Sequence, residues 1–69
     1  MESKKFKFTI ADGTVVPVEL RAIPGDDKWS RWDADERYLA EISWRCNSCG
    51  RPAMVEVDEV GKKFLKVYI

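Results

Sequence analysis

The chain has 69 residues, enough for one small domain with a thin core, and we place that domain at residues 1–69. Its composition is 45% hydrophobic and 12% aromatic, and 12 basic residues balance 12 acidic ones, which excludes the highly charged, apolar-poor class of disordered chains. No apolar run approaches the about 18 residues of a membrane helix, and the first residues lack the apolar core of a signal peptide. We therefore expect a soluble, cytoplasmic protein without a membrane partner.

The absence of histidine limits the chemistry that this chain can perform. Histidine is the commonest general base near neutral pH, so Ser-His-Asp and Cys-His catalysis are both excluded. The sequence also lacks the G-x-x-x-x-G-K and G-x-G-x-x-G loops that hold nucleotide phosphates. A thin domain offers little space for a pocket that excludes water. We therefore expect no enzyme and no catalytic residues.

Two runs of alternating apolar and polar residues between positions 5 and 20 predict a β-hairpin. A three-residue turn with Gly13 in the left-handed conformation places Phe8 opposite Val16 and keeps the apolar side chains of both strands on one face. Pro17 cannot donate a hydrogen bond to a neighbouring strand, so we expect the second strand to lie at a sheet edge there.

The middle of the chain is harder to assign. Turn residues and charges over positions 22–36 predict a polar loop. Apolar and polar residues then alternate over 38–45, which predicts a strand with Trp44 in the core. A helix competes here, because Asp33 and Glu36, three residues later, resemble a capping box. The alternation is longer than the helical pattern, so the strand is favoured, and the choice between strand and helix stays open.

Residues 53–57 and 64–69 predict a second hairpin. With Gly61 as the left-handed residue of a three-residue turn, Val55 faces Leu65, which repeats the register of the first hairpin. The five predicted strands make an all-β fold, a small antiparallel sheet or an open barrel.

The motif with recognisable chemistry is Cys46-Asn47-Ser48-Cys49-Gly50. Two thiolates with two residues between them reach one tetrahedral metal ion from a tight turn, and Gly50 allows the positive φ that closes such a turn. A CxxCG segment between two strands resembles the knuckle of zinc-ribbon and rubredoxin-like proteins. This resemblance, confined to residues 46–52 and their flanks, implies that Cys46 and Cys49 are zinc ligands between the third and fourth strands.

Four states of this cysteine pair remain open, because the sequence holds no second Cys or His pair. Two chains could share one zinc ion as a homodimer, or a partner protein or Asp and Glu side chains of this chain could complete the site. The pair could form a knuckle without metal. It could also be a redox dithiol, although the following Gly50-Arg51-Pro52 and strand differ from the helix N-terminus that commonly lowers a thiol pKa.

Trp29-Ser30-Arg31-Trp32 is an unusual aromatic stretch in the predicted polar loop. Tryptophan and arginine are frequent anchors of protein interfaces, so Trp29, Arg31, Trp32 and the neighbouring Lys28 form the predicted partner contact. The same residues could stack on unpaired bases and bind phosphates. Alternatively, one or both tryptophans belong to the core.

Lysines gather near both ends of the chain. If the first and last strands are neighbours, these side chains form one basic patch that could bind nucleic acid or an acidic protein surface: Lys5, Lys7, Lys62, Lys63 and Lys66. Lysines on edge strands also protect a sheet from edge-to-edge association, and a solvated face is the competing interpretation.

The predicted function is a small, non-catalytic protein-interaction module, an adaptor or regulator that docks on a larger protein. Transcription-machinery accessories and phage-type regulators are examples by analogy of size and class. The first alternative is a single-stranded nucleic-acid-binding protein, and a weaker one is a CxxC thiol redox protein.

Overall fold

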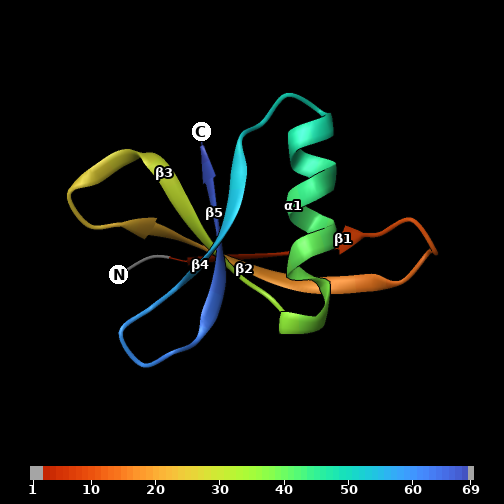
Figure 1. The fold of residues 1–69 in the computed structure, drawn as a ribbon, viewed down its shortest axis with the longest axis horizontal. Coiled ribbons are helices and arrows are strands. Elements are labelled where there is room, and N and C mark those ends of the chain that lie inside the picture. Colours follow the sequence, from red (N-terminus) through yellow and green to blue (C-terminus); the bar gives the residue numbers. More distant parts are fainter. Residues whose placement is uncertain (1–2, 69) are drawn as a thin grey trace.

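The computed structural model describes residues 3–68, which form a five-stranded antiparallel sheet with one helical segment (Figure 1). In chain order the elements are β1 (Ser3–Thr9), β2 (Val15–Ile23), β3 (Asp26–Asp33), a 3₁₀ turn η1 (Glu36–Tyr38), α1 (Leu39–Ser48), β4 (Ala53–Val57) and β5 (Lys63–Tyr68). The strands lie in the order β1-β2-β3-β5-β4, so β1 and β4 are the two edges. The fold is mixed α/β, and the predicted all-β class is wrong.

Both predicted hairpin registers are confirmed. Phe8 pairs with Val16 in the first hairpin, and Val55 pairs with Leu65 in the second. Gly13 and Gly61 have φ of +89° and +85°, so each three-residue turn uses glycine where the chain needs a left-handed residue. The predicted residue Ile69 lies outside the described part of the chain.

The edge position of Pro17 is also confirmed. Pro17 faces Lys7 of β1, whereas the pairing of β2 with β3 begins only at Glu19. On the β3 side, the first part of β2 therefore has no neighbouring strand that would need the missing N–H.

Strand β3 replaces most of the predicted polar loop over 22–36, and the turn is confined to Pro24 and Gly25. The charges misled the prediction because, in the second half of β3, Arg31 and Asp33 alternate with Ser30 and Trp32. Ser30 and Trp32 are buried on the side that α1 covers, whereas Arg31 lies on the far side of the sheet beside Arg21 and Lys66. A strand with one charged face is normal in a sheet with one solvated face.

Helix α1 replaces the predicted strand over 38–45. Leu39, Ile42 and Cys46 are buried at the i, i+3, i+7 spacing of a helix face. Trp44 lies two residues from Ile42, which is more than half a turn around the helix, and it is 69% exposed rather than in the core. The helical segment begins with Asp35, not Asp33: its carboxylate accepts the backbone N–H of Arg37.

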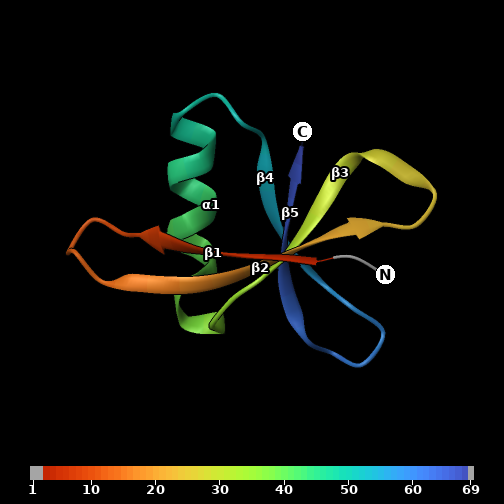
Figure 2. The same ribbon diagram turned by 180° about the vertical axis from the view of Figure 1, so that it is seen from behind.

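The helix covers one side of a strongly twisted sheet. Figures 1 and 2 show the β1–β2 hairpin running crosswise to β4 and β5, with α1 between β4 and the turn that joins β1 to β2. The core lies between this helix and the sheet, and ten residues of the described part of the chain are buried in it: Ile10, Val16, Val18, Trp32, Leu39, Ile42, Cys46, Ala53, Leu65 and Val67. Within residues 3–68, no helix is long and apolar enough to cross a membrane.

Candidate functional site

The CxxC motif lies at the C-terminal end of α1, not in a knuckle between two strands. Cys46 belongs to the last helical turn, and Cys49 follows the helix as its cap. The backbone N–H of Cys49 bonds the Arg45 carbonyl at 3.1 Å, and that of Arg51 bonds the Cys46 carbonyl at 2.9 Å. Gly50 has φ of +85°, as a glycine that ends a helix commonly does. The predicted knuckle is therefore wrong: CxxCG is here a helix-termination signal.

The surroundings of Cys46 do not favour a redox nucleophile. Both cysteines are free; Cys46 is buried and Cys49 is exposed. Burial raises the pKa of the Cys46 thiol, Arg51 opposes this effect, and Cys49 raises the pKa further. A reactive thiol needs a lowered pKa, so the burial of Cys46 acts against a redox role for this thiol.

The geometry also limits what the two cysteines can bind. Over residues 3–68, no group of three or more Cys, Asp or Glu side chains is placed to hold a metal ion. A shared zinc ion would therefore need ligands from a second chain to join Cys46 and Cys49.

A hollow of about 270 Å³ opens beside the cysteines, between the end of α1 and the sheet. Its lining combines two aromatic rings, two guanidinium groups and the two thiols: Phe8, Trp32, Arg45, Arg51, Cys46 and Cys49. We call it the arginine hollow. The Arg45 guanidinium carbon lies 5.9 Å from the centre of the Phe8 ring, within cation–π range.

The structure divides the predicted Trp29–Trp32 contact between the two sides of the sheet. Trp32 is 5% exposed, packs edge-on against Phe6 with ring centres 5.1 Å apart, and donates its indole N–H to the Ser30 hydroxyl at 3.1 Å. It is a core residue. Lys28 is exposed near the beginning of β3, where its backbone N–H bonds the Asp26 carboxylate.

Trp29 lies on the far side of the sheet and is half-buried. Its ring meets the Tyr68 ring edge-on, with centres 5.0 Å apart, and the Lys66 ammonium lies 5.1 Å from its centre. We call Trp29, Lys66 and Tyr68 the Trp29 cluster. Of the predicted contact residues, Trp29 and Lys28 keep surface that a partner could reach.

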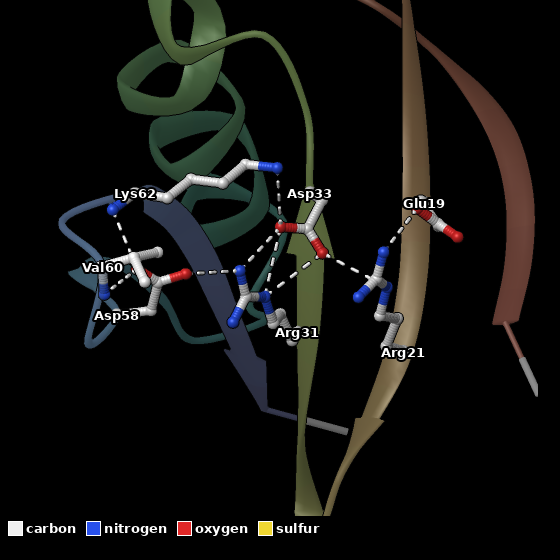
Figure 3. Close-up of polar contacts among 7 residues, drawn as sticks. All are labelled: Glu19, Arg21, Arg31, Asp33, Asp58, Val60 and Lys62. Carbon is white, nitrogen blue, oxygen red and sulfur yellow. Dashed lines mark hydrogen bonds and ion pairs between the residues drawn. The ribbon is translucent and has the colours of Figure 1, made fainter. Parts of the chain in front are cut away.

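Arg31 is occupied within the molecule. Its guanidinium donates to the Asp33 carboxylate at 3.1 Å and to the Asp58 carboxylate at 3.0 Å, and it lies 4.3 Å from the centre of the Phe64 ring. Figure 3 shows Arg31 between these two carboxylates, with Lys62 and Arg21 approaching Asp33 from either side.

The same carboxylates tie the last turn to the sheet. Asp58 also accepts the backbone N–H of Val60 and Lys62 in the turn between β4 and β5. The Lys62 N–H bond, followed by the Arg31 guanidinium, lowers the pKa of Asp58. This network fixes the turn against β3, which is a structural role.

The predicted basic patch is not brought together. Strands β2 and β3 separate β1, which carries Lys5 and Lys7, from β5, which carries Lys66. Lys62 lies 3.9 Å from the Asp33 carboxylate, and Lys63 lies 3.4 Å from a carboxylate oxygen of Glu36. Lysines on the edge strand β1 match the protective arrangement that prevents edge-to-edge pairing.

The other edge, β4, is a site that sequence reasoning missed. The backbone N–H of Tyr68 donates to the Pro52 carbonyl, and that of Asp58 donates to the Lys62 carbonyl. These two bonds establish which residues of β4 direct their backbone groups towards β5 and which direct them outward. By this alternation, the backbone N–H and C=O groups of Ala53, Val55 and Val57 point away from β5.

Among residues 3–68, only the first of these three positions has a hydrogen-bond partner on its outward side. The Asn47 side chain bonds both the N–H and the carbonyl of Ala53, at 2.9 and 3.1 Å. The next two positions face outward along an edge where Met54, Val55 and Val57 are all exposed. The sequence signal was three apolar residues among four, with Glu56 as the single charge.

No protein-family model, curated protein or solved structure matches this chain.

Proposed function

We propose that this protein is a non-catalytic interaction module that binds an extended segment of a larger partner protein along β4. The observation that supports the proposal is the contrast between the two sheet edges. Edge strand β1 carries three lysines, Lys4, Lys5 and Lys7, whereas β4 exposes Met54, Val55 and Val57 beside a single charge. Proteins normally protect such edges with charges, and an unprotected one is a template for strand addition.

The partner strand would gain both backbone and side-chain contacts. The outward N–H and C=O groups of Val55 and Val57 offer four hydrogen-bonding positions to an adjacent strand. The exposed side chains of these two valines lie on the same side as Leu65 and would pack against alternate side chains of the partner. Backbone bonds supply the affinity in this mode of recognition, and side-chain pairs supply the specificity.

Glu56 selects the kind of partner. Two copies of this chain could pair their β4 strands antiparallel, with Val55 of each copy opposite Val57 of the other and with Ala53 still bonded to Asn47. In this arrangement Glu56 would face the same glutamate of the second copy. Directly opposed like charges destabilise a strand pair, so a second copy of this chain is disfavoured. A different protein with Lys or Arg opposite Glu56 would form a favourable pair there.

The test uses two matched variants and a defined peptide. Val57 is 58% exposed on the β4 edge, and Val15 is 51% exposed at the beginning of β2. Val57→Lys therefore places a positive charge on the docking edge, and Val15→Lys places the same charge away from it. The probe is a soluble extended peptide with Val-Lys-Val at its centre, and the readout is hydrogen exchange of backbone amides.

We expect this peptide to slow exchange at Val55 and Val57 in the wild type and in Val15→Lys, but not in Val57→Lys. A peptide with Val-Glu-Val should protect these amides less, because its glutamate would oppose Glu56. Equal protection by the two peptides, or protection that survives Val57→Lys, would contradict docking on β4.

The Trp29 cluster favours a second candidate, single-stranded nucleic-acid binding. Trp29 and Tyr68 could stack on bases while Lys66, 5.1 Å from the Trp29 ring, contacts phosphate. Such binding weakens steeply as salt rises, because phosphate contacts release counterions. A labelled oligonucleotide titrated at low salt tests it: Trp29→Ala should abolish binding, and an unbound wild type removes this candidate.

A further inference from the structure

The five arginines of this chain divide into two groups. Arg21, Arg31 and Arg37 each form an ion pair with a carboxylate at 3.1 Å or less. Arg45 and Arg51 make no ion pair and no side-chain hydrogen bond with any residue between 3 and 68. These two arginines both line the arginine hollow. The guanidinium groups without a carboxylate partner are thus gathered at one place.

Capping of α1 does not account for them. Positive side chains near a helix C-terminus often bond its last carbonyl groups. Here the carbonyls of Arg45, Cys46 and Asn47 already accept backbone N–H groups from Cys49, Arg51 and Gly50, at 2.9–3.2 Å. The donors of both guanidinium groups are therefore available to another acceptor.

The surroundings of these donors favour an anion with an apolar part. No Asp or Glu is among the six residues that line the hollow, so a bound anion meets no negative side chain there. Phe8 and Trp32 supply aromatic walls. A guanidinium group binds phosphate through two parallel hydrogen bonds, and a concave surface with low-dielectric walls strengthens the field of its charges.

We propose that the arginine hollow binds the phosphate monoester of a small aromatic group. A phosphate monoester carries a charge of about −1.5 to −2 at neutral pH, which balances two guanidinium groups, whereas a carboxylate would leave one of them uncompensated. The volume of about 270 Å³ lies just below the range of about 300–1,000 Å³ that is usual for ligand pockets, so it suits one ring with its phosphate rather than a dinucleotide. This site is separate from β4 and does not depend on strand addition there.

The experiment titrates phenyl phosphate into the ¹⁵N-labelled protein and follows the Nε–H signals of Arg45 and Arg51 and the Cys49 amide. We expect saturable shifts at these groups and weaker binding of inorganic phosphate, which lacks the ring. Arg45→Gln and Arg51→Gln should each lower the affinity by about tenfold, the typical effect of losing a charge-assisted hydrogen bond.

Arg37→Gln is the matched control, because Arg37 is an exposed arginine outside the hollow and pairs with Asp35. It should bind phenyl phosphate as the wild type does. Unchanged spectra elsewhere in each variant verify the fold, since Arg45 and Arg51 are not core residues. The proposal is overturned if no saturable shift appears at the hollow, if the Arg45→Gln and Arg51→Gln proteins bind like the wild type, or if benzoate binds as tightly as phenyl phosphate.

Discussion

Replacing Trp32 by alanine tests the assignment of this residue to the core. Trp32 is 5% exposed, and it packs against Phe6 and Phe8 with ring centres 5.1 and 6.5 Å apart. Truncation of a buried tryptophan to alanine costs about 3–5 kcal/mol, mostly through the cavity that it leaves. No buried donor is orphaned, because the Ser30 hydroxyl that accepts the indole N–H keeps its own bond to the Val67 carbonyl at 3.2 Å.

This cost is large against the stability of so small a domain. At about 0.05–0.15 kcal/mol per residue, 69 residues give a free energy of unfolding of about 3–10 kcal/mol. Trp32→Ala therefore removes from a third to all of the stability. With a urea m-value of about 1 kcal/mol/M for a chain of this size, the unfolding midpoint should fall by about 3–5 M, or the variant should be unfolded in water.

The assay is urea unfolding followed by far-UV circular dichroism, which does not depend on the fluorescence of the deleted tryptophan. Trp44→Ala is the matched control, because Trp44 is 69% exposed and its removal should change stability by no more than about 0.5 kcal/mol. If Trp32→Ala unfolds at the wild-type midpoint, or if Trp44→Ala is the more damaging substitution, the assignment of the two tryptophans is wrong.

Three further outcomes follow from local contacts. The side chain and then the backbone N–H of Arg37 lower the pKa of Asp35 from 3.8 to about 2. Ionised Asp35 therefore stabilises the fold above pH 3.8, and this contribution is lost as the pH falls towards 2. Asp35→Asn should thus weaken the dependence of the melting temperature on pH between about 4 and 2. Parallel melting-temperature profiles for the variant and the wild type would argue against this role of Asp35. Gly61→Ala should lower the free energy of unfolding by about 1 kcal/mol, because Gly61 has φ of +85°, a conformation that alanine disfavours. The cost is conformational and not steric, since a Cβ at this position would meet no atom within 4 Å. An unchanged thermal midpoint would show that the turn has a different conformation. Iodoacetamide should modify exposed Cys49 in the native protein and buried Cys46 only after unfolding. Mass spectrometry of the proteolytic peptides measures the two modification rates, and equal rates in the native protein would contradict the buried position of Cys46.

Local rules were sufficient for the two hairpins. A strand has a side-chain period of two, so the pairing that keeps the apolar sets together is unique once the turn length is known. The glycines of both turns mark that length, and the registers of Phe8 with Val16 and of Val55 with Leu65 agree with it.

The same rules failed between residues 22 and 48, for two physical reasons. In β3, the far side of the sheet is charged because Arg31 finds carboxylate partners from β3 itself and from the distant β4–β5 turn. No local pattern announces such partners. In α1, Ile42 fits both a strand period and a helix period, and over so short a segment periodicity does not separate the two.

The candidate sites depend still more on distant contacts. The cysteine spacing is compatible with a knuckle, and the strand that was expected before it supported that interpretation. Once α1 occupies this segment, the same residues become a helix end in which backbone groups bond the carbonyls of Arg45 and Cys46. The arginine hollow needs Phe8 from β1 and Trp32 from β3 to complete its walls, and chain order gives no hint of their approach.

The sequence by itself determined the two β-hairpins, their registers and their glycine turns, because each depends on residues within about one hairpin of one another. The tertiary structure decided that 36–48 is helical, since a sheet with one apolar face must bury that face under another layer. It also decided which two strands form the edges of the sheet. The order β1-β2-β3-β5-β4 leaves β4 at the margin, and strand order is set by the packing of the whole chain rather than by any segment of it.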